Sequence, residues 1–158
     1  MNALAARIGR RLKAKRAMLV TAESCTGGWV AQAVTAISGS SQWFERGFVS
    51  YSNAAKQEML GVGKNTLRKW GAVSEETARE MAKGALKRSG GTIAVAVTGV
   101  AGPTGGTAAK PVGMVCFCWA TKKSLWSETR RLRGNRESVR RQSVVHALKG
   151  VLALVAGG

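Results

Sequence analysis

The sequence predicts a single α/β domain over residues 1–158, a three-layer α/β/α sandwich built on a mixed sheet. Three observations support this fold class. Helix and strand signals alternate along the chain, short apolar runs rich in β-branched residues indicate buried strands, and amphipathic stripes indicate helices that cover a sheet. A chain of 158 residues with 45% hydrophobic content is long enough for one buried core.

The first half of the chain is expected to contain four helices and two strands. An apolar run predicts each strand, and an apolar stripe or a capping residue predicts each helix. In order, these are a helix with Ala5, Ile8 and Leu12 on one face, a strand at 17–22, a helix from Thr26 to residue 37, a strand at 44–51, a helix at 53–60 capped by Ser52 or Asn53, and a turn of helix at 64–70.

The second half begins with the clearest helix, which follows the N-cap residue Ser74 and stops at Gly90 and Gly91. Its apolar residues recur at helical spacing, with two glutamates in the first turn. Strands are expected at 92–99, 112–121 and 124–134. Asn135 is a good cap for a last helix, whose apolar stripe consists of Val144, Leu148, Val151 and Val155.

The chain is extremely basic, with a formal net charge of +17 concentrated in residues 7–16 and 122–149. Such a surface attracts polyanions, so nonspecific nucleic-acid binding is one hypothesis, and a solvated basic face on two helices is the other. The three cysteines are an odd number, which favours a reducing, cytoplasmic setting. No apolar run is long enough for a membrane span and none is typical of a signal peptide, so no membrane association is expected.

A metal site is not expected. Cys25, Cys116, Cys118 and His146 have the right ligand chemistry for zinc, but no C-x-x-C spacing accompanies them. A Ser-His-Asp triad is excluded because the chain contains no Asp.

Two strands are followed by turns rich in Gly and Thr, at 21–28 and at 98–113. Ligands of open α/β sheets bind at the carboxyl ends of strands, and backbone N–H groups in such turns bind anions. Neither turn matches a Walker A loop or G-x-G-x-x-G. The long second loop is either a flexible crossover or a binding loop, and its length favours binding.

Four segments, in this order and spacing, resemble the CinA C-terminal-domain family, which contains nicotinamide-nucleotide amidases. They are TAESCTGG, SGSSQWFERGFVSYSNAAKQEMLGV, GAVSEETAREMAKGAL and VTGVAGPTGGTAAKPVG. The resemblance covers residues 17–147. It implies hydrolysis of the carboxamide of nicotinamide mononucleotide to the acid and ammonia, in pyridine-nucleotide recycling, without a cofactor. Many relatives carry a further N-terminal domain that looks like a molybdopterin-binding fold; this chain looks like the stand-alone form.

The resemblance implies a Ser/Lys site with Ser24 as nucleophile and Lys56 as base. Partial burial and nearby positive charge are expected to lower the pKa of Lys56 towards working pH. Tyr51 is expected either to relay a proton or hydrogen-bond the nucleophile, or to form the cleft wall. Glu23 is expected to orient Lys56, to cap the following helix or to form a salt bridge, and Cys25 is an alternative nucleophile.

Substrate contacts are expected from both turns and from the last helix. Backbone N–H groups of the first turn are suited to an oxyanion, and the loop from Thr98 to Gly106 is suited to the phosphate, ribose or carboxamide. The expected binding residues are Cys25, Thr26, Gly27, Gly28, Thr98, Gly99, Gly102, Gly105 and Gly106, together with Arg136 and Arg140, which either clamp a phosphate or are solvated.

Two further expectations concern partners. Trp29, Trp43 and Trp119 are interpreted as core or subunit contacts, and a homo-oligomer is expected. The competing function is a non-catalytic nucleic-acid-binding or stress-related module on the same fold. It is disfavoured because aromatic residues are not interleaved with the basic runs as stacking platforms would require.

Overall fold

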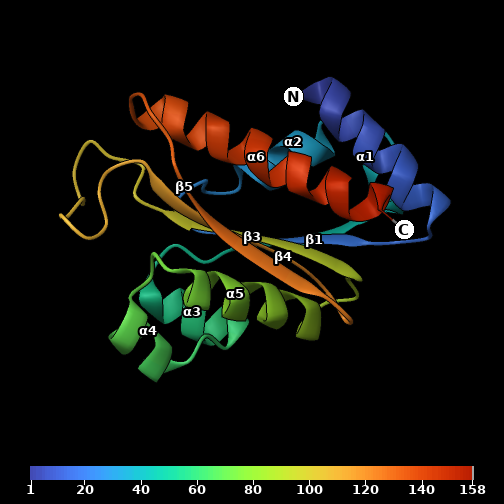
Figure 1. Cartoon of the computed structure of the whole chain (residues 1–158). Coiled ribbons are helices and arrows are strands. Elements are labelled where there is room, and N and C mark those ends of the chain that lie inside the picture. Colours follow the sequence, from blue (N-terminus) through green and yellow to red (C-terminus); the bar gives the residue numbers. More distant parts are fainter. Residues whose placement is uncertain (158) are drawn as a thin grey trace.

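A five-stranded sheet lies between two layers of helices in the computed structural model, which describes residues 1–157 (Figure 1). The strand order is β2-β1-β3-β4-β5. Strand β1 is parallel to β2 and β3, whereas β4 is antiparallel to both of its neighbours, β3 and β5. The strands are β1 Leu19–Glu23, β2 Phe44–Val49, β3 Ile93–Gly99, β4 Met114–Thr121 and β5 Leu125–Arg131. This mixed sheet confirms the predicted fold class.

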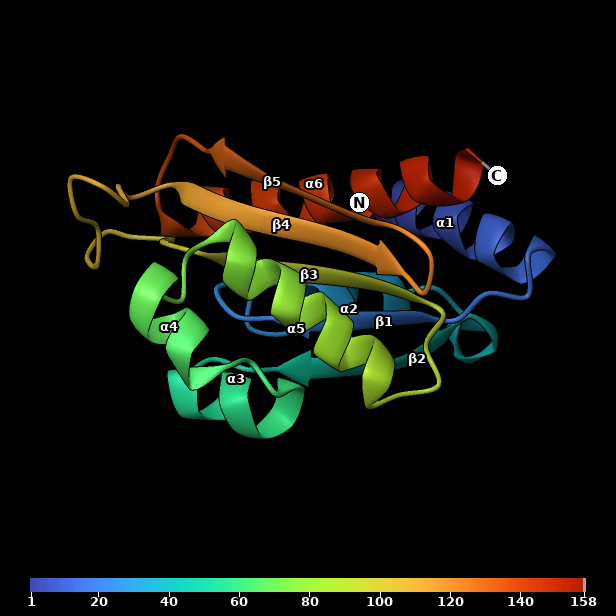
Figure 2. The same ribbon diagram turned by 60° about the horizontal axis from the view of Figure 1, so that its bottom comes forward.

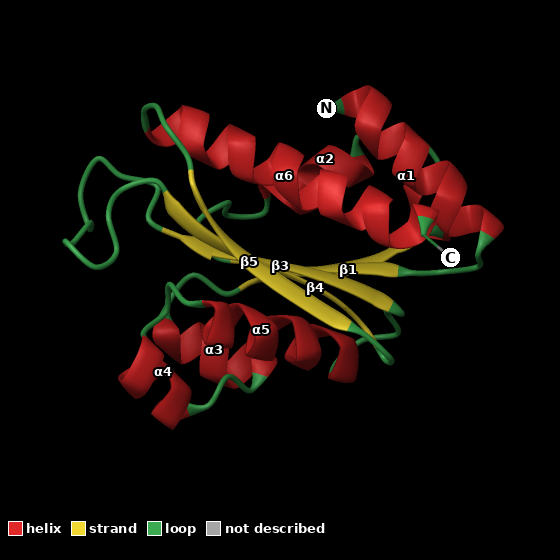
Figure 3. Cartoon of the chain, in the orientation of Figure 1, coloured by secondary structure: helices red, strands yellow, loops and turns green. Residues whose placement is uncertain are grey.

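Helices cover both faces of the sheet, and each layer has its own apolar core (Figures 2 and 3). One layer consists of α1 Asn2–Ala14, α2 Trp29–Thr35 and α6 Arg136–Ala156; the other consists of α3 Asn53–Leu60, α4 Lys64–Trp70 and α5 Glu75–Lys87. A short 3₁₀ turn, η1 Ser40–Gln42, precedes β2. None of the helices in residues 1–157 is long and apolar enough to cross a membrane.

Capping residues start the helices as the sequence predicted. The side chains of Ser74 and Asn135 accept hydrogen bonds from backbone N–H groups at the starts of α5 and α6. Ser52, rather than Asn53, caps α3. The predicted start of the second helix at Thr26 was wrong, because Gly28 precedes α2 in a left-handed conformation that ends the turn and delays the helix to Trp29.

The carboxyl ends of β1, β2 and β3 lie at one end of the sheet, since these three strands are parallel. The turn at 24–28 leaves β1 there, and the long loop at 100–113 leaves β3 at the same end (Figure 1). Ser50 joins this edge directly after β2, and its N–H donates to the carbonyl of Glu23 at 2.8 Å. The topology therefore brings both Gly-rich turns and the start of α3 together.

Close contact between α5 and the end of α3 depends on Gly84. A Cβ at this position would overlap the backbone carbonyl of Leu60, which cannot move as a side-chain end can. The fold therefore requires glycine in a helix where alanine has the higher intrinsic propensity.

We expect Gly84→Ala to lower the free energy of unfolding by about 1–3 kcal/mol, because overpacking outweighs the helical preference of alanine. Lys87→Ala, an exposed change on the same helix, is the control and is expected to stay within about 0.5 kcal/mol of the wild type. Urea unfolding followed by circular dichroism measures both. A Gly84→Ala protein as stable as the wild type would contradict this account of the α3–α5 contact.

Candidate active site

A cleft of about 280 Å³ opens at the carboxyl ends of β1, β2 and β3. It is bordered by the turn after β1, the start of α3, the loop after β3 and the first residue of α6. Its lining residues are Ser24, Cys25, Tyr51, Lys56, Ala72, Val73, Thr98, Gly99, Val100, Ala101, Gly102, Thr104, Gly105 and Arg136.

Ser24 and Lys56 are in direct contact at the bottom of this cleft. The Lys56 Nζ donates to Ser24 Oγ at 2.8 Å, to the Ser50 carbonyl at 2.8 Å and to the Tyr51 carbonyl at 3.3 Å. Only 1% of Lys56 is exposed to solvent. Two residues that lie 32 positions apart in sequence are thus joined by the fold.

Burial lowers the pKa of Lys56 to about 8. Desolvation is the cause, because the charged ammonium loses its hydration inside the protein. Nearby positive charge, which was expected from the sequence, does not contribute to the lowered pKa of Lys56. Within residues 1–157, the one charge effect on this pKa comes from Cys25 and raises it. A neutral amine has two N–H donors and one lone pair. The two carbonyls match the donors, and Ser24 Oγ is placed to give its proton to the lone pair.

Glu23 anchors the turn that presents Ser24. Its carboxylate is buried and accepts from the hydroxyl of Thr26 at 2.6 Å and from the N–H groups of Val30 at 2.8 Å and Ala31 at 3.0 Å. A carboxylate that accepts hydrogen bonds from the N–H groups at the start of a helix is stabilised, because these hydrogen bonds are charge-assisted. Of the three roles considered for Glu23, the geometry matches the helix cap.

Tyr51 borders the cleft with an exposed side chain, 61% accessible to solvent. Its phenol oxygen accepts a hydrogen bond from Arg136 Nη2 at 3.2 Å. Its backbone carbonyl, rather than its phenol, contacts Lys56. This placement matches a cleft wall.

Cys25 also lines the cleft beside Ser24, although side chains of adjacent residues in a strand point to opposite faces. Alternation ends at Glu23, where β1 stops and the chain turns. The Cys25 thiol is buried, and desolvation raises its pKa to about 12. A thiol with so high a pKa is a poor source of thiolate at neutral pH.

The first Gly-rich turn leaves few N–H groups for an oxyanion. The N–H of Ser24 donates to the Val97 carbonyl, and the N–H of Gly27 donates to the Ser24 carbonyl. The backbone donors that remain next to Ser24 are therefore those of Cys25 and Thr26. The hydroxyl of Thr26 is committed to Glu23. Gly27 and Gly28 have left-handed backbones and lie outside the cleft lining.

The end of β3 contributes Thr98 and Gly99 to the cleft, and the loop that follows contributes Gly102 and Gly105. Thr98 is buried, and its hydroxyl donates to the Ala72 carbonyl at 2.8 Å, which ties β3 to the segment before α5. Gly106 does not line the cleft, because it packs against Val112 on the other limb of the loop.

The two arginines of α6 have different positions. Arg136 lines the cleft and donates to the Gly102 carbonyl at 2.8 Å as well as to Tyr51. Arg140 instead donates to the carbonyls of Cys25 at 3.0 Å and Thr26 at 3.1 Å. Arg140 therefore holds the turn after β1 from outside the cleft, and the two arginines together border a concave surface next to Trp29.

Several cleft residues were missed by sequence reasoning. Ser50 was missed because its contact with Lys56 is made by the backbone carbonyl, which no side-chain pattern reveals. Ala72 and Val73 were missed because apolar residues before a helix carry no chemical signal. Thr104 and the flanking Val100 and Ala101 belong to the predicted loop, but their side chains gave no reason to single them out. In the described part of the chain, no three His, Cys, Asp or Glu side chains form a metal-binding group.

The chain is similar to known proteins in both sequence and structure. Residues 1–155 match the model of the CinA C-terminal domain. The chain is 50% identical over 154 residues to "Nicotinamide-nucleotide amidohydrolase PncC" of Pseudomonas putida, covering 98% of this chain and 96% of that protein. It is 52% identical to the protein of the same name from Escherichia coli K12 over 147 residues, covering 92% and 89%. The solved structure of the competence/damage inducible protein CihA from Agrobacterium tumefaciens superposes with a TM-score of 0.94 at 47% identity, covering 97% and 94%.

We expect Glu23→Gln to lower the free energy of unfolding by about 1.5–3 kcal/mol, because the amide cannot replace all three charge-assisted hydrogen bonds. Glu58→Gln, on the exposed face of α3, is the matched control and is expected to change stability by less than about 0.5 kcal/mol. Thermal unfolding of both variants checks this. Equal stability of the two variants would show that Glu23 does not anchor the turn.

Proposed function

The chain belongs to the CinA C-terminal domain family, and on that premise we propose that it is a nicotinamide-nucleotide amidohydrolase that uses Ser24 and Lys56. The reaction converts nicotinamide mononucleotide and water to nicotinate mononucleotide and ammonia. The observation that carries the assignment of the site is the buried hydrogen bond between Lys56 Nζ and Ser24 Oγ. This contact pairs a nucleophile, Ser24, with a base, Lys56, so an amidase site is formed without histidine or aspartate.

Acylation begins with neutral Lys56 accepting the proton of Ser24 as Oγ attacks the carboxamide carbon. The two carbonyls of Ser50 and Tyr51 hold the amine in the orientation that this transfer needs. The carbonyl oxygen of the substrate becomes an oxyanion. The N–H groups of Cys25 and Thr26 are proposed to stabilise it, since they adjoin the nucleophile and are fixed by the Glu23 cap.

Collapse of this intermediate breaks the carbon–nitrogen bond. The Lys56 ammonium returns its proton to the leaving nitrogen, which departs as ammonia and leaves an acyl ester on Ser24. Water then attacks the ester with Lys56 again as base, and Ser24 is regenerated as nicotinate mononucleotide leaves. The same carbonyl partners serve the charged and neutral forms of Lys56, so the cycle needs no rearrangement of the site.

The nucleotide part of the substrate is proposed to lie along the second loop. Thr98, Gly99, Gly102 and Gly105 line the cleft there, and Arg136 provides the one cationic group of the lining apart from Lys56. We assign the phosphate to Arg136 and the loop backbone. Supporting roles fall to Gly27, Gly28, Gly106 and Arg140, which shape the two turns from outside the cleft.

A non-catalytic nucleic-acid-binding module is not favoured, because it would have no use for the buried Ser24–Lys56 contact. Nonspecific attraction of nucleic acid to the basic surface is compatible with the enzyme and is proposed only as a secondary property. We further propose that residues 1–158 form one amidohydrolase domain that works in the cytoplasm as a homo-oligomer. The three free cysteines support the reducing compartment.

We expect Ser24→Ala and Lys56→Met each to lower kcat/KM for nicotinamide mononucleotide by about 10³-fold or more, since the two residues act as one unit. Methionine replaces the buried ammonium by an apolar chain of similar length. Ammonia release, measured with EDTA present, is the readout. Wild-type activity is expected to be unchanged by EDTA.

Cys25→Ala is the control for the neighbouring nucleophile and is expected to retain activity within about tenfold of wild type. Activity that survives Ser24→Ala and disappears in Cys25→Ala would transfer the nucleophile to the thiol. An inactive wild-type protein would refute the proposed reaction itself.

The pH dependence follows from the pKa of Lys56, which is lowered to about 8. Only the neutral amine acts as base, so kcat/KM is expected to rise about tenfold per pH unit below this pKa and to level off above it. Initial rates from pH 6 to 9.5 at constant ionic strength measure the curve. A rate that is flat across this range would exclude Lys56 as the group whose deprotonation limits the reaction.

A further inference from the structure

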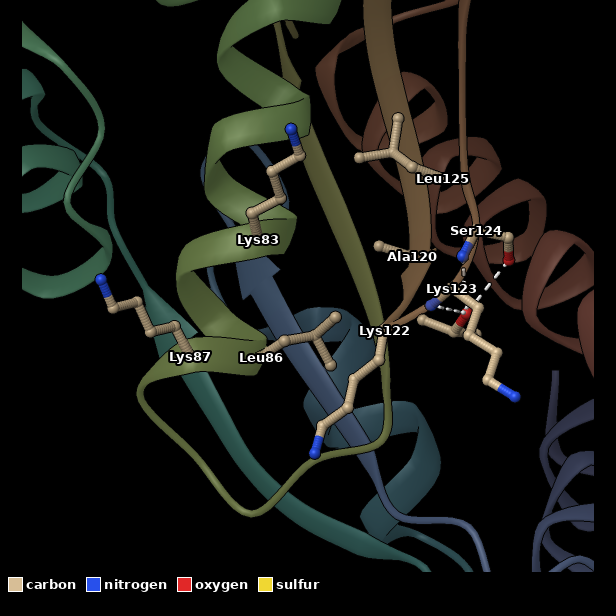
Figure 4. A pocket seen from close by; sticks show the side chains of 9 residues that line it. Lys83, Leu86, Lys87, Ala120, Lys122, Lys123, Ser124 and Leu125 are labelled. Atoms are coloured by element: carbon tan, nitrogen blue, oxygen red, sulfur yellow. Dashed lines mark hydrogen bonds between the residues drawn. The ribbon is translucent and has the colours of Figure 1, made fainter.

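A second concave surface lies at the opposite end of the sheet from the cleft (Figure 4). Its volume is about 440 Å³, within the size range of ligand pockets. It lies between the last turns of α5 and the turn from β4 to β5, where Ala120 pairs with Ala94 at the start of β3. Because Thr98 and Gly99 line the cleft four and five residues further along β3, the two sites are separated by about 13–17 Å along this strand.

Four lysines surround this surface, which we call the lysine groove: Lys83 and Lys87 from α5, and Lys122 and Lys123 from the turn. No carboxylate lines it. Within residues 1–157, none of these four ammonium groups forms an ion pair, whereas Arg79, Arg130 and Arg141 each pair with a glutamate. The positive charge of the groove is therefore uncompensated by the protein and is available to an anionic ligand.

The floor of the groove is apolar. Leu86 of α5 and Leu125 of β5 flank Ala120, and Leu125 is 36% exposed. Figure 4 shows Lys83 and Lys122 on either side of Leu86 and Ala120, while Lys87 and Lys123 extend away from the centre. A ligand that fits this arrangement has an aliphatic group for the floor and separated negative charges for the rim.

The turn that carries two of the lysines is rigidly built. The hydroxyl of Thr121 accepts from the N–H groups of Lys123 at 3.2 Å and Ser124 at 3.0 Å, and the N–H of Thr121 donates to the Ser124 carbonyl at 2.8 Å. The backbone is thus fixed before a ligand arrives, which lowers the entropic cost of binding.

The groove includes Leu125 of β5, which is an edge strand because it pairs only with β4 within the described residues 1–157. An unpaired edge strand binds an extended peptide through its backbone groups. Further along the same strand, Arg131 is exposed and forms no ion pair within residues 1–157, whereas Arg130 pairs with Glu128. No aromatic side chain lines the groove, so a nucleic-acid base has no ring on which to stack. These features favour a peptide over a nucleic acid.

We propose that the lysine groove is a docking site for an acidic, extended peptide segment of a partner protein, which inserts one aliphatic side chain between Leu86 and Leu125. Glutamate or aspartate side chains on both sides of that residue pair with Lys83 and Lys122. The site is independent of the amidase reaction, because none of its residues lines the catalytic cleft.

The test is the binding of a fluorescein-labelled peptide with four glutamates around a central leucine, measured by fluorescence anisotropy at 0.15 M salt. We expect Lys83→Gln with Lys122→Gln to raise the Kd about fivefold or more, and Leu125→Ser to raise it about threefold or more. Replacing the peptide's leucine by serine is expected to weaken binding to the wild-type protein to the same extent as Leu125→Ser. Ammonia release by these variants should equal that of the wild type, which also reports that they are folded.

The matched control is Lys13→Gln with Lys64→Gln, two exposed lysines outside the groove whose loss lowers the net charge equally. If this control weakens the peptide as much as the groove variant does, binding is general attraction to a basic protein and the proposal fails. If a five-nucleotide oligothymidylate binds more tightly than the peptide, and the Lys83→Gln, Lys122→Gln variant loses this binding, the ligand of the groove is a nucleic acid and the peptide proposal fails. If the peptide does not bind at all, the proposal fails, and the role of the lysines is then to protect an edge strand from aggregation.

Discussion

Burial of Lys56 against Ser24 is the interaction on which the rest of the site depends. An ammonium group in the interior is costly unless it is hydrogen-bonded, and here three oxygens surround it. The same burial lowers the pKa of Lys56 to about 8, so the residue can act as a base near neutral pH. Burial therefore accounts both for the lowered pKa of Lys56 and for its need of hydrogen-bond partners.

That surrounding comes from the sheet. Parallel β1, β2 and β3 end together, so the nucleophile turn, the Ser50 carbonyl and the binding loop meet without long connections. Glu23 links the end of β1 to the start of α2, and Arg140 holds the same turn through two backbone carbonyls. Ser24 is thus positioned by a glutamate on one side and an arginine on the other, neither of which takes part in the proposed chemistry.

Charge is distributed unequally between the two ends of the sheet. At the catalytic end, cationic groups are engaged: Lys56 and Arg140 are hydrogen-bonded to backbone carbonyls, and Arg136 contacts Gly102 and Tyr51. At the opposite end, Lys83 and Lys122 have no acidic partner in the described residues, although they flank an apolar surface. With eight acidic residues against 25 lysines and arginines, the chain cannot neutralise most of its own positive charge.

The sequence by itself determined the fold class and the order of the elements, and it yielded Ser24 and Lys56 as the predicted reactive pair. Period-two and period-3.6 patterns and caps such as Ser74 are local signals, and the residue inventory without Asp left Ser24 and Lys56 as the pair that the family motifs indicated. Only the tertiary structure decided which carbonyls hold Lys56, that Glu23 is a cap, and that Arg136 and Arg140 have separate positions. These depend on contacts between segments far apart in the chain and on burial, which exist only once the sheet and both helical layers are packed.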